Sequence, residues 1–148
     1  TGENTYAEVD MSAQHMWYVQ NGQVVLETDV VTGEPIPSKI TPEGVYSLMW
    51  KQPNSVLVGD INPDTGEPAY RTKVKYWMQV TSSGVGFHDA TWQTAFGGTL
   101  YQIPGTGSHG CINMPLDQAG ALFNMIEPGT PVIFHWLIKI NFLCKCTN

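Results

Sequence analysis

The sequence predicts one mainly β domain that contains a single appreciable α-helix. At 148 residues, the chain is long enough for one domain and too short for two comfortable ones. Hydrophobic residues make up 42% of the chain and charged residues only 14%, against about 25% in an average soluble domain, so a packed core is expected and disorder is excluded. Turn signals and period-two patterns recur along the chain, whereas helical spacing occurs in one segment.

The N-terminal part of the chain predicts a β-hairpin. Strands over residues 16–20 and 23–27 flank Asn21-Gly22, and a type I′ turn needs positive φ at both central residues, which Asn and Gly tolerate. After a turn-rich run, residues 45–51 form a further predicted strand. Residues 59–70 contain two glycines and two prolines, so we expect an exposed loop there.

The middle of the chain predicts two strands that lead to a histidine. Residues 74–80 alternate with a period of two, which is typical of a strand with one buried face. The residues expected on that face are Val74, Tyr76, Met78 and Val80. A short strand over residues 85–87 then delivers His88 at its end, and residues 89–110 are expected to be mostly loop.

One helix is predicted in the C-terminal third. Apolar residues at helical spacing mark its buried face, namely Leu116, Ala119, Leu122, Phe123 and Ile126. We expect Asn113 to cap its N-terminus, Pro115 to lie in its first turn and Pro128-Gly129 to end it. Residues 130–134 supply a closing strand.

The charge and hydropathy of the chain restrict its partners. The net charge is -6, with seven Lys and Arg, which argues against nucleic-acid binding because such sites usually rest on a basic footprint. No apolar run reaches the roughly 18 residues of a membrane span. The chain begins at Thr1 without an initiator Met, so we expect a domain cut from a longer precursor that held any leader or anchor. We expect this domain to be a monomer.

Cysteine usage singles out one residue. The chain has three cysteines, and two of them, Cys144 and Cys146, lie close together in an apolar C-terminal tail over residues 136–148, to which we assign no role. Three cysteines cannot form a disulfide scaffold, so at least one thiol is free. Cys111 stands alone in mid-chain, within the run SHGCIN at residues 108–113.

The surroundings of Cys111 favour covalent thiol catalysis. A predicted helix begins just after it, and the partial positive charge at a helix N-terminus favours a thiolate. Gly110 lets backbone amides approach a bound carbonyl, as an oxyanion hole requires. Such a nucleophile needs a base: His109 is two residues away, and His88 lies at a strand end that the fold could bring opposite Cys111.

Two other interpretations of Cys111 stay open at this point. A lone cysteine is often simply a small buried hydrophobic residue. A zinc site built from His88, His109 and Cys111 is the second, although His-x-Cys is not the usual ligand spacing and no fourth ligand is obvious, so we expect no metal. His15 and His135 are expected to be ordinary strand residues.

Two segments of the chain are informative together: FHDATW at residues 87–92 and SHGCIN at residues 108–113. With YWM at residues 76–78 and the weaker TPEG turn at residues 41–44, they resemble the catalytic domain of L,D-transpeptidases, the YkuD family. The histidine paired with the six-residue block is the specific part of this resemblance. It implies a mainly β, sandwich or barrel-like fold with one helix after the cysteine, in a catalytic domain over residues 1–135.

The resemblance also implies roles for individual residues. Cys111 would be the nucleophile and His88 its base, oriented by the carbonyl or the side chain of Asp89. His109 would help to hold the site or stabilise the oxyanion, and the amides of Gly110 and Cys111 would receive the developing negative charge. The residues expected to brace the motif or line the substrate channel are Ser108, Asn113, Trp92 and Tyr76.

The implied reaction is acyl transfer in peptidoglycan synthesis, and therefore in cell-wall biogenesis and cell shape. The thiol would attack the amide between the L-centre and the D-Ala of a tetrapeptide stem and release D-Ala. An amine of a neighbouring stem would resolve the thioester as a 3→3 cross-link. Carbapenems would acylate the same thiol, and no metal or organic cofactor is implied. The protein would work outside the cytoplasm, secreted or anchored to the wall or membrane.

Alternatives remain within and outside this family. Water as the acceptor would make the chain an L,D-carboxypeptidase or wall hydrolase, and a buried, inert Cys111 would leave a non-catalytic cell-wall-binding module. The gap between His88 and Ser108 contains 19 residues, 89–107, and GTG at residues 105–107 extends it. This long loop leaves the selectivity for donor and acceptor open.

Overall fold

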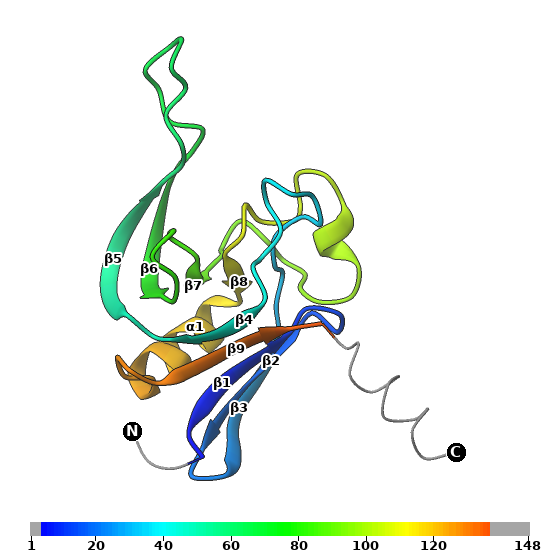
Figure 1. The fold of residues 1–148 in the computed structure, drawn as a ribbon, viewed down its shortest axis with the longest axis vertical. Helices are drawn as coiled ribbons and strands as arrows, with labels where there is room; N and C mark the ends of the chain where they lie inside the picture. Colours follow the sequence, from blue (N-terminus) through cyan, green and yellow to red (C-terminus); the bar gives the residue numbers. More distant parts are fainter. Residues whose placement is uncertain (1–3, 137–148) are drawn as a thin grey trace.

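The computed structural model describes residues 4–136 and contains two β-sheets (Figure 1). The first has the order β3-β2-β1-β9-β4. Its strands are β1 (Tyr6–Asp10), β2 (His15–Gln20), β3 (Gln23–Asp29), β4 (Gly44–Ser47) and β9 (Pro131–His135). The second has the order β5-β6-β7-β8, with β5 (Trp50–Val58), β6 (Arg71–Gln79), β7 (Gly86–Asp89) and β8 (Ile112–Met114). Two pairs are parallel, β1 with β9 and β7 with β8, and the remaining pairs are antiparallel.

One α-helix, α1 (Leu116–Met125), joins the two sheets into a single core. It contacts β6 and β7 of the second sheet and β3 of the first. A short 3₁₀ helix, η1 (Leu100–Gln102), lies in the loop that follows β7. The largest buried side chains come from both sheets and the helix, and include Tyr18, Met78, Phe87, Ile112, Leu122 and Phe134. The predicted mainly β fold with one helix after Cys111 is therefore confirmed.

The predicted hairpin is confirmed in place and in turn geometry. Strands β2 and β3 pair from His15↔Asp29 to Gln20↔Gln23. At the turn, Asn21 has φ 52° and Gly22 has φ 81°, the positive values that this turn requires. The expected exposed loop over residues 59–70 connects β5 to β6, and Figure 1 shows these strands continuing into an arm that projects from the body.

The single strand predicted over residues 45–51 is wrong. The chain leaves the first sheet after β4 and enters the second at β5, and the two residues between them mark the crossing. Leu48 is buried and donates its N–H to Thr130 O at 2.8 Å, whereas Met49 donates to Gln79 O of β6 at 2.8 Å. Both halves have strand-like composition, so the local pattern does not reveal the change of sheet.

The helix start predicted at Asn113 is also wrong. Asn113 belongs to β8, where it exchanges backbone hydrogen bonds with Val31 at 2.8 and 3.0 Å. Pro115 occupies the N-cap position and the helix begins at Leu116. Cys111 therefore precedes a strand rather than a helix, and the helix dipole does not act on its thiol.

The end of β9 leads to the last described residue. Trp136 packs against Tyr101 of η1, with ring centroids 6.2 Å apart. The predictions about Cys144, Cys146 and the rest of the tail fall outside the described residues. Within residues 4–136, no helix is long and apolar enough to cross a membrane.

Candidate active site

The parallel pairing of β7 with β8 brings His88 and Cys111 to one face of the second sheet. His88 pairs with Asn113, and extending the register by one residue places Cys111 opposite Gly86. Side chains two residues apart on a strand share a face, so Cys111 and Asn113 project to the same side as His88. The sequence separates the two reactive groups by 22 residues, 89–110, and the sheet makes them diagonal neighbours.

These side chains line one cavity of about 230 Å³. The predicted residues around it are His88, Trp92, Ser108, His109, Cys111 and Asn113. Its walls also contain Glu34, Lys39, Leu57, Tyr70, Thr72 and the glycine-rich loop at residues 105–107. Six of the nine residues predicted for the site therefore line one cavity.

His88 is arranged as a neutral base. Its ring is buried, and Nδ1 lies 2.8 Å from the carbonyl oxygen of Asp89. A carbonyl only accepts, so Nδ1 carries the proton and Nε2 keeps its lone pair. Burial lowers the pKa of His88, although Asp89 opposes the shift through this hydrogen bond and its charge. Trp77 and Trp92 flank the imidazole, with centroids 6.0 and 5.9 Å away.

Asp89 contributes its carbonyl and its carboxylate to different partners. The carbonyl accepts from His88, whereas the carboxylate accepts from the backbone N–H of Lys75 and of Tyr76, each at 2.9 Å on Oδ1. The side chain thus fixes the strand that lies beside β7, and the main chain orients the imidazole. Of the two ways in which the resemblance lets Asp89 orient His88, the structure shows the carbonyl.

The surroundings of Cys111 favour the protonated thiol, in contrast to the expected thiolate. Burial raises its pKa to about 11, and a backbone hydrogen bond from Gly86 offsets only part of this. The sulfur lies 3.6 Å from Gly84 O. No helix N-terminus lies at the thiol, and Lys39, the Lys or Arg among the described residues that line the cavity, is paired with Glu34 at 2.8 Å. His88 is placed in the same cavity as a candidate base for this thiol.

The hydroxyl of Ser108 closes the turn that carries the cysteine. It donates to Cys111 O at 2.5 Å and accepts the Gly110 N–H at 3.0 Å. The expectation that both Gly110 and Cys111 amides face the oxyanion is therefore corrected, because Ser108 already holds the first of them. Among the turn and loop hydrogen bonds of residues 4–136, none uses the Cys111 N–H, which leaves it as the candidate donor to an oxyanion. Gly110 has φ 132°, a backbone conformation that residues with a side chain rarely adopt.

A segment far upstream holds this turn from the other side. Thr41 donates its hydroxyl to Gly110 O at 2.7 Å and accepts the Gly33 N–H at 2.9 Å. Ser108 donates its N–H to Thr32 O at 3.0 Å. In the sequence, the TPEG turn is only a weak family similarity, and Gly33 carries no functional signal. This brace is built from main-chain groups and one hydroxyl, which give little signal in a sequence.

Gly33→Ala is expected to disrupt the brace. A Cβ at this position would lie 1.8 Å from Lys39 O and 3.0 Å from Gly110 Cα, so the backbone must move. We expect a loss of about 1–3 kcal/mol or more in the free energy of unfolding in urea, together with slower acylation of Cys111. The control is Gly66→Asn, at an exposed glycine with φ 73° and open space around it. Wild-type stability and acylation rate in Gly33→Ala would contradict this account.

Tyr76 does not lie where the resemblance places it. Its ring packs on Phe123 of α1, with centroids 5.3 Å apart, and lies against Gly120. It therefore faces the helix, on the opposite side of the sheet from His88. The neighbouring Trp77 points toward His88, because adjacent residues of a strand face opposite sides.

Tyr70 is a site residue that sequence analysis missed. It lines the cavity, and its ring packs at a tilt of 45° against the exposed His109, with a centroid distance of 4.8 Å. Burial raises its pKa, and the nearby Cys111 adds to the shift. Gly59 makes room for it, since a Cβ there would lie 2.6 Å from the ring. Tyr70 ends the loop that connects β5 to β6, and no periodicity marks it.

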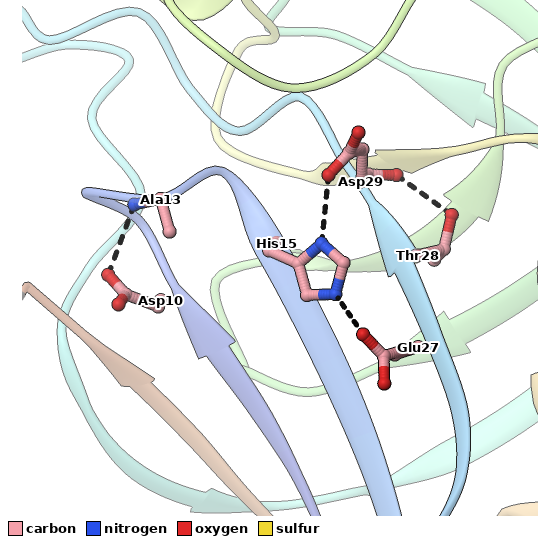
Figure 2. Close-up of polar contacts among 6 residues, drawn as sticks. All are labelled: Asp10, Ala13, His15, Glu27, Thr28 and Asp29. Atoms are coloured by element: carbon pink, nitrogen blue, oxygen red, sulfur yellow. Dashed lines mark hydrogen bonds and ion pairs between the residues drawn. The ribbon is translucent and has the colours of Figure 1, made fainter.

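The two histidines outside the cavity are partly buried and pair with carboxylates of the first sheet. Figure 2 shows the His15 ring between two carboxylates of β3, with Nδ1 2.8 Å from Asp29 and Nε2 3.1 Å from Glu27. His135 pairs with Glu8 at 2.8 Å. In the part of the chain that the structure describes, no three His, Cys, Asp or Glu side chains are placed to hold a metal ion.

Comparison with known proteins places these residues in a family context. The model of the YkuD family, described as the L,D-transpeptidase catalytic domain, matches residues 4–134. L,D-transpeptidase 1 of Mycobacterium tuberculosis is 29% identical over 136 residues, which cover 89% of this chain and 51% of the relative. The chain thus spans about half the length of this relative.

Solved structures show the same fold. A cysteine-to-serine mutant of the Enterococcus faecium L,D-transpeptidase is 44% identical, with a TM-score of 0.79 over 90% of this chain and 50% of that chain. The catalytic domain of the E. faecium enzyme acylated by ertapenem is 46% identical, with a TM-score of 0.75 over 91% of this chain and 99% of that chain.

Proposed function

Because this chain belongs to the L,D-transpeptidase catalytic-domain (YkuD) family, we propose that it forms 3→3 cross-links between peptidoglycan stems through a thioester on Cys111. The observation that carries the proposal is that the Cys111 thiol lines the same cavity as the buried His88, an imidazole whose free nitrogen is Nε2. Both side chains project from one sheet face into one cavity.

In the first half-reaction, His88 Nε2 takes the proton of the thiol as Sγ bonds to the carbonyl carbon of stem residue 3. The Cys111 N–H stabilises the developing oxyanion. When the C–N bond breaks, the imidazolium returns its proton to the nitrogen of D-Ala, which leaves. The neutral thiol and imidazole of the resting site suit this exchange, because no ion pair has to be dismantled before attack.

In the second half-reaction, an amine on residue 3 of another stem attacks the thioester. His88 Nε2 accepts its proton, the new amide bond forms, and the C–S bond breaks as Sγ regains a proton. Water in place of the amine would give L,D-carboxypeptidase activity from the same residues. The ratio of cross-linking to hydrolysis depends on whether an amine or water reaches the thioester in the cavity.

The proposal extends to a class of inhibitors and to the place where the protein works. Carbapenems should acylate Cys111, as the relative acylated by ertapenem suggests, because a strained β-lactam carbonyl meets the same nucleophile and oxyanion donor. Peptidoglycan lies outside the cytoplasmic membrane, so the protein should work there, secreted or anchored to the wall or membrane.

The test supplies a disaccharide-tetrapeptide to the purified chain and analyses the products by mass spectrometry. We expect D-Ala release and a dimer whose amide joins residue 3 of both stems, and we expect added amine to divert the acyl group from water. Tripeptide as the sole product at every amine concentration would indicate a carboxypeptidase. The absence of both products, together with an inert thiol, would reject acyl transfer.

A further inference from the structure

We propose that a groove beside the catalytic cavity binds the N-acetylated amino sugar that carries the donor stem. The groove extends from Cys111 to Trp50 and is lined by indole, amide, hydroxyl and aliphatic side chains. This inference rests on the proposed function, because a peptidoglycan stem is what would bring a sugar to this site.

Trp50 and Cys111 lie at the ends of one row across the second sheet. Trp50 on β5 pairs with Gln79 on β6, and Gln79 pairs with Gly86 on β7. The register of β7 with β8, extended by one residue, places Cys111 opposite Gly86. Neighbouring strands are about 4.8 Å apart, so three steps separate Trp50 from Cys111 by about 14 Å.

That separation matches the length of the donor stem. The amide that Cys111 attacks follows the third stem residue, and three extended residues span at most about 10–11 Å. The lactyl ether that joins the peptide to the sugar adds the remaining few ångströms. A stem that lies across the strands with its third residue at Cys111 therefore brings its sugar to Trp50.

The end of the groove remote from Cys111 suits an uncharged sugar. Trp50 is 39% exposed, and the buried Trp77 supports it edge-on with centroids 6.5 Å apart. Trp50 pairs with Gln79 and Trp77 pairs with Gln52, so the two indoles alternate with two amides. An indole face packs against the C–H groups of a sugar ring, and amides exchange hydrogen bonds with hydroxyl and acetamido groups. Gln79 Nε2 donates to Thr81 O at 2.9 Å, which orients its Oε1 as an acceptor.

This groove differs from the two other cavities that Cys111 lines in having no charged side chain among the described residues. The catalytic cavity contains Glu34 and Lys39, and a third cavity that Cys111 also lines contains Asp60. A charged ligand in the groove would lose its hydration without gaining an ionic partner, so a neutral ligand is favoured there.

The experiment measures binding, which does not depend on turnover. The full chain with Cys111→Ala is titrated calorimetrically with a tetrapeptide stem and with the same stem attached to its N-acetylated disaccharide. We expect the sugar to tighten binding by about five- to tenfold, the scale of one good aromatic contact. Trp50→Ala, added to this background, should bring the ratio of the two dissociation constants close to one, and Trp50→Phe should keep part of it. Trp17→Ala, which removes an indole on the first sheet, is the control and should leave the ratio unchanged.

Two outcomes would overturn the inference. Equal dissociation constants for the two ligands with Trp50 in place would show that the sugar adds nothing to binding. A ratio that survives in Trp50→Ala would place the sugar elsewhere. The proposed function fails separately, when wild-type chain turns over neither donor, and the binding ratio still decides whether the groove recognises the sugar.

Discussion

Cys111→Ala is expected to abolish D-Ala release from a tetrapeptide stem, with a loss of at least about 10³-fold in rate. The side chain supplies the atom that bonds to the substrate, and no other sulfur is found among residues lining the catalytic cavity. The same change should abolish the mass increase that a carbapenem produces on the intact chain. Coupled detection of D-Ala and intact-mass spectrometry measure the two effects.

The other two cysteines provide the matched control. The double variant Cys144→Ser/Cys146→Ser should retain the carbapenem adduct, and peptide mapping of the wild type should place it on Cys111. Thermal unfolding of Cys111→Ala should resemble that of the wild type, because removing Sγ loses only weak sulfur contacts to the backbone of Gly84 and Gly86. An adduct that persists in Cys111→Ala but disappears in the double variant would move the nucleophile to the C-terminal segment.

Fold class was predictable because its signals are local. The turn at Asn21-Gly22 follows from the positive φ that these two residues tolerate. The alternation along residues 74–80 follows from the pleat of a strand, which points successive side chains to opposite faces. The crossing at Leu48 depends instead on partners at Thr130 and Gln79, far along the chain. Strand β1 was not predicted at all, since it is five residues long and is stabilised between β2 and β9.

The candidate site was predictable only as far as its chemistry lies in side chains. Cys111 and His88 carry reactive groups, and the motifs around them are distinctive. The thiol pKa was misjudged because β8 separates Cys111 from the helix, and three residues suffice to remove the dipole. Gly33 and Tyr70 were missed because their contributions, a close backbone approach and a ring held over a glycine, exist only in the folded chain.

His88→Ala is expected to slow acylation of Cys111 by about 10²–10⁴-fold at neutral pH. The thiol of Cys111 has a pKa of about 11, so without a base it is almost entirely protonated and a weak nucleophile. Its residual reactivity should rise with pH as the thiolate forms. The rate of carbapenem acylation, followed by mass spectrometry across pH, measures this change. His135→Gln, which alters a histidine paired with Glu8 on the first sheet, is the control and should keep the wild-type profile.

The acid side of the wild-type profile tests the role of His88 independently. Only the neutral imidazole can take the thiol proton, so the rate should fall as pH drops through the His88 pKa. Because burial lowers that pKa, the fall should lie below the usual histidine value of about 6.5, and the site should stay active in mildly acidic solution. In His88→Ala this acid limb should vanish and leave only the alkaline rise. A fall in rate that lies above the usual histidine range, or that persists in His88→Ala, would assign the base to another group. The exposed His109, which lines the same cavity, would then be the candidate.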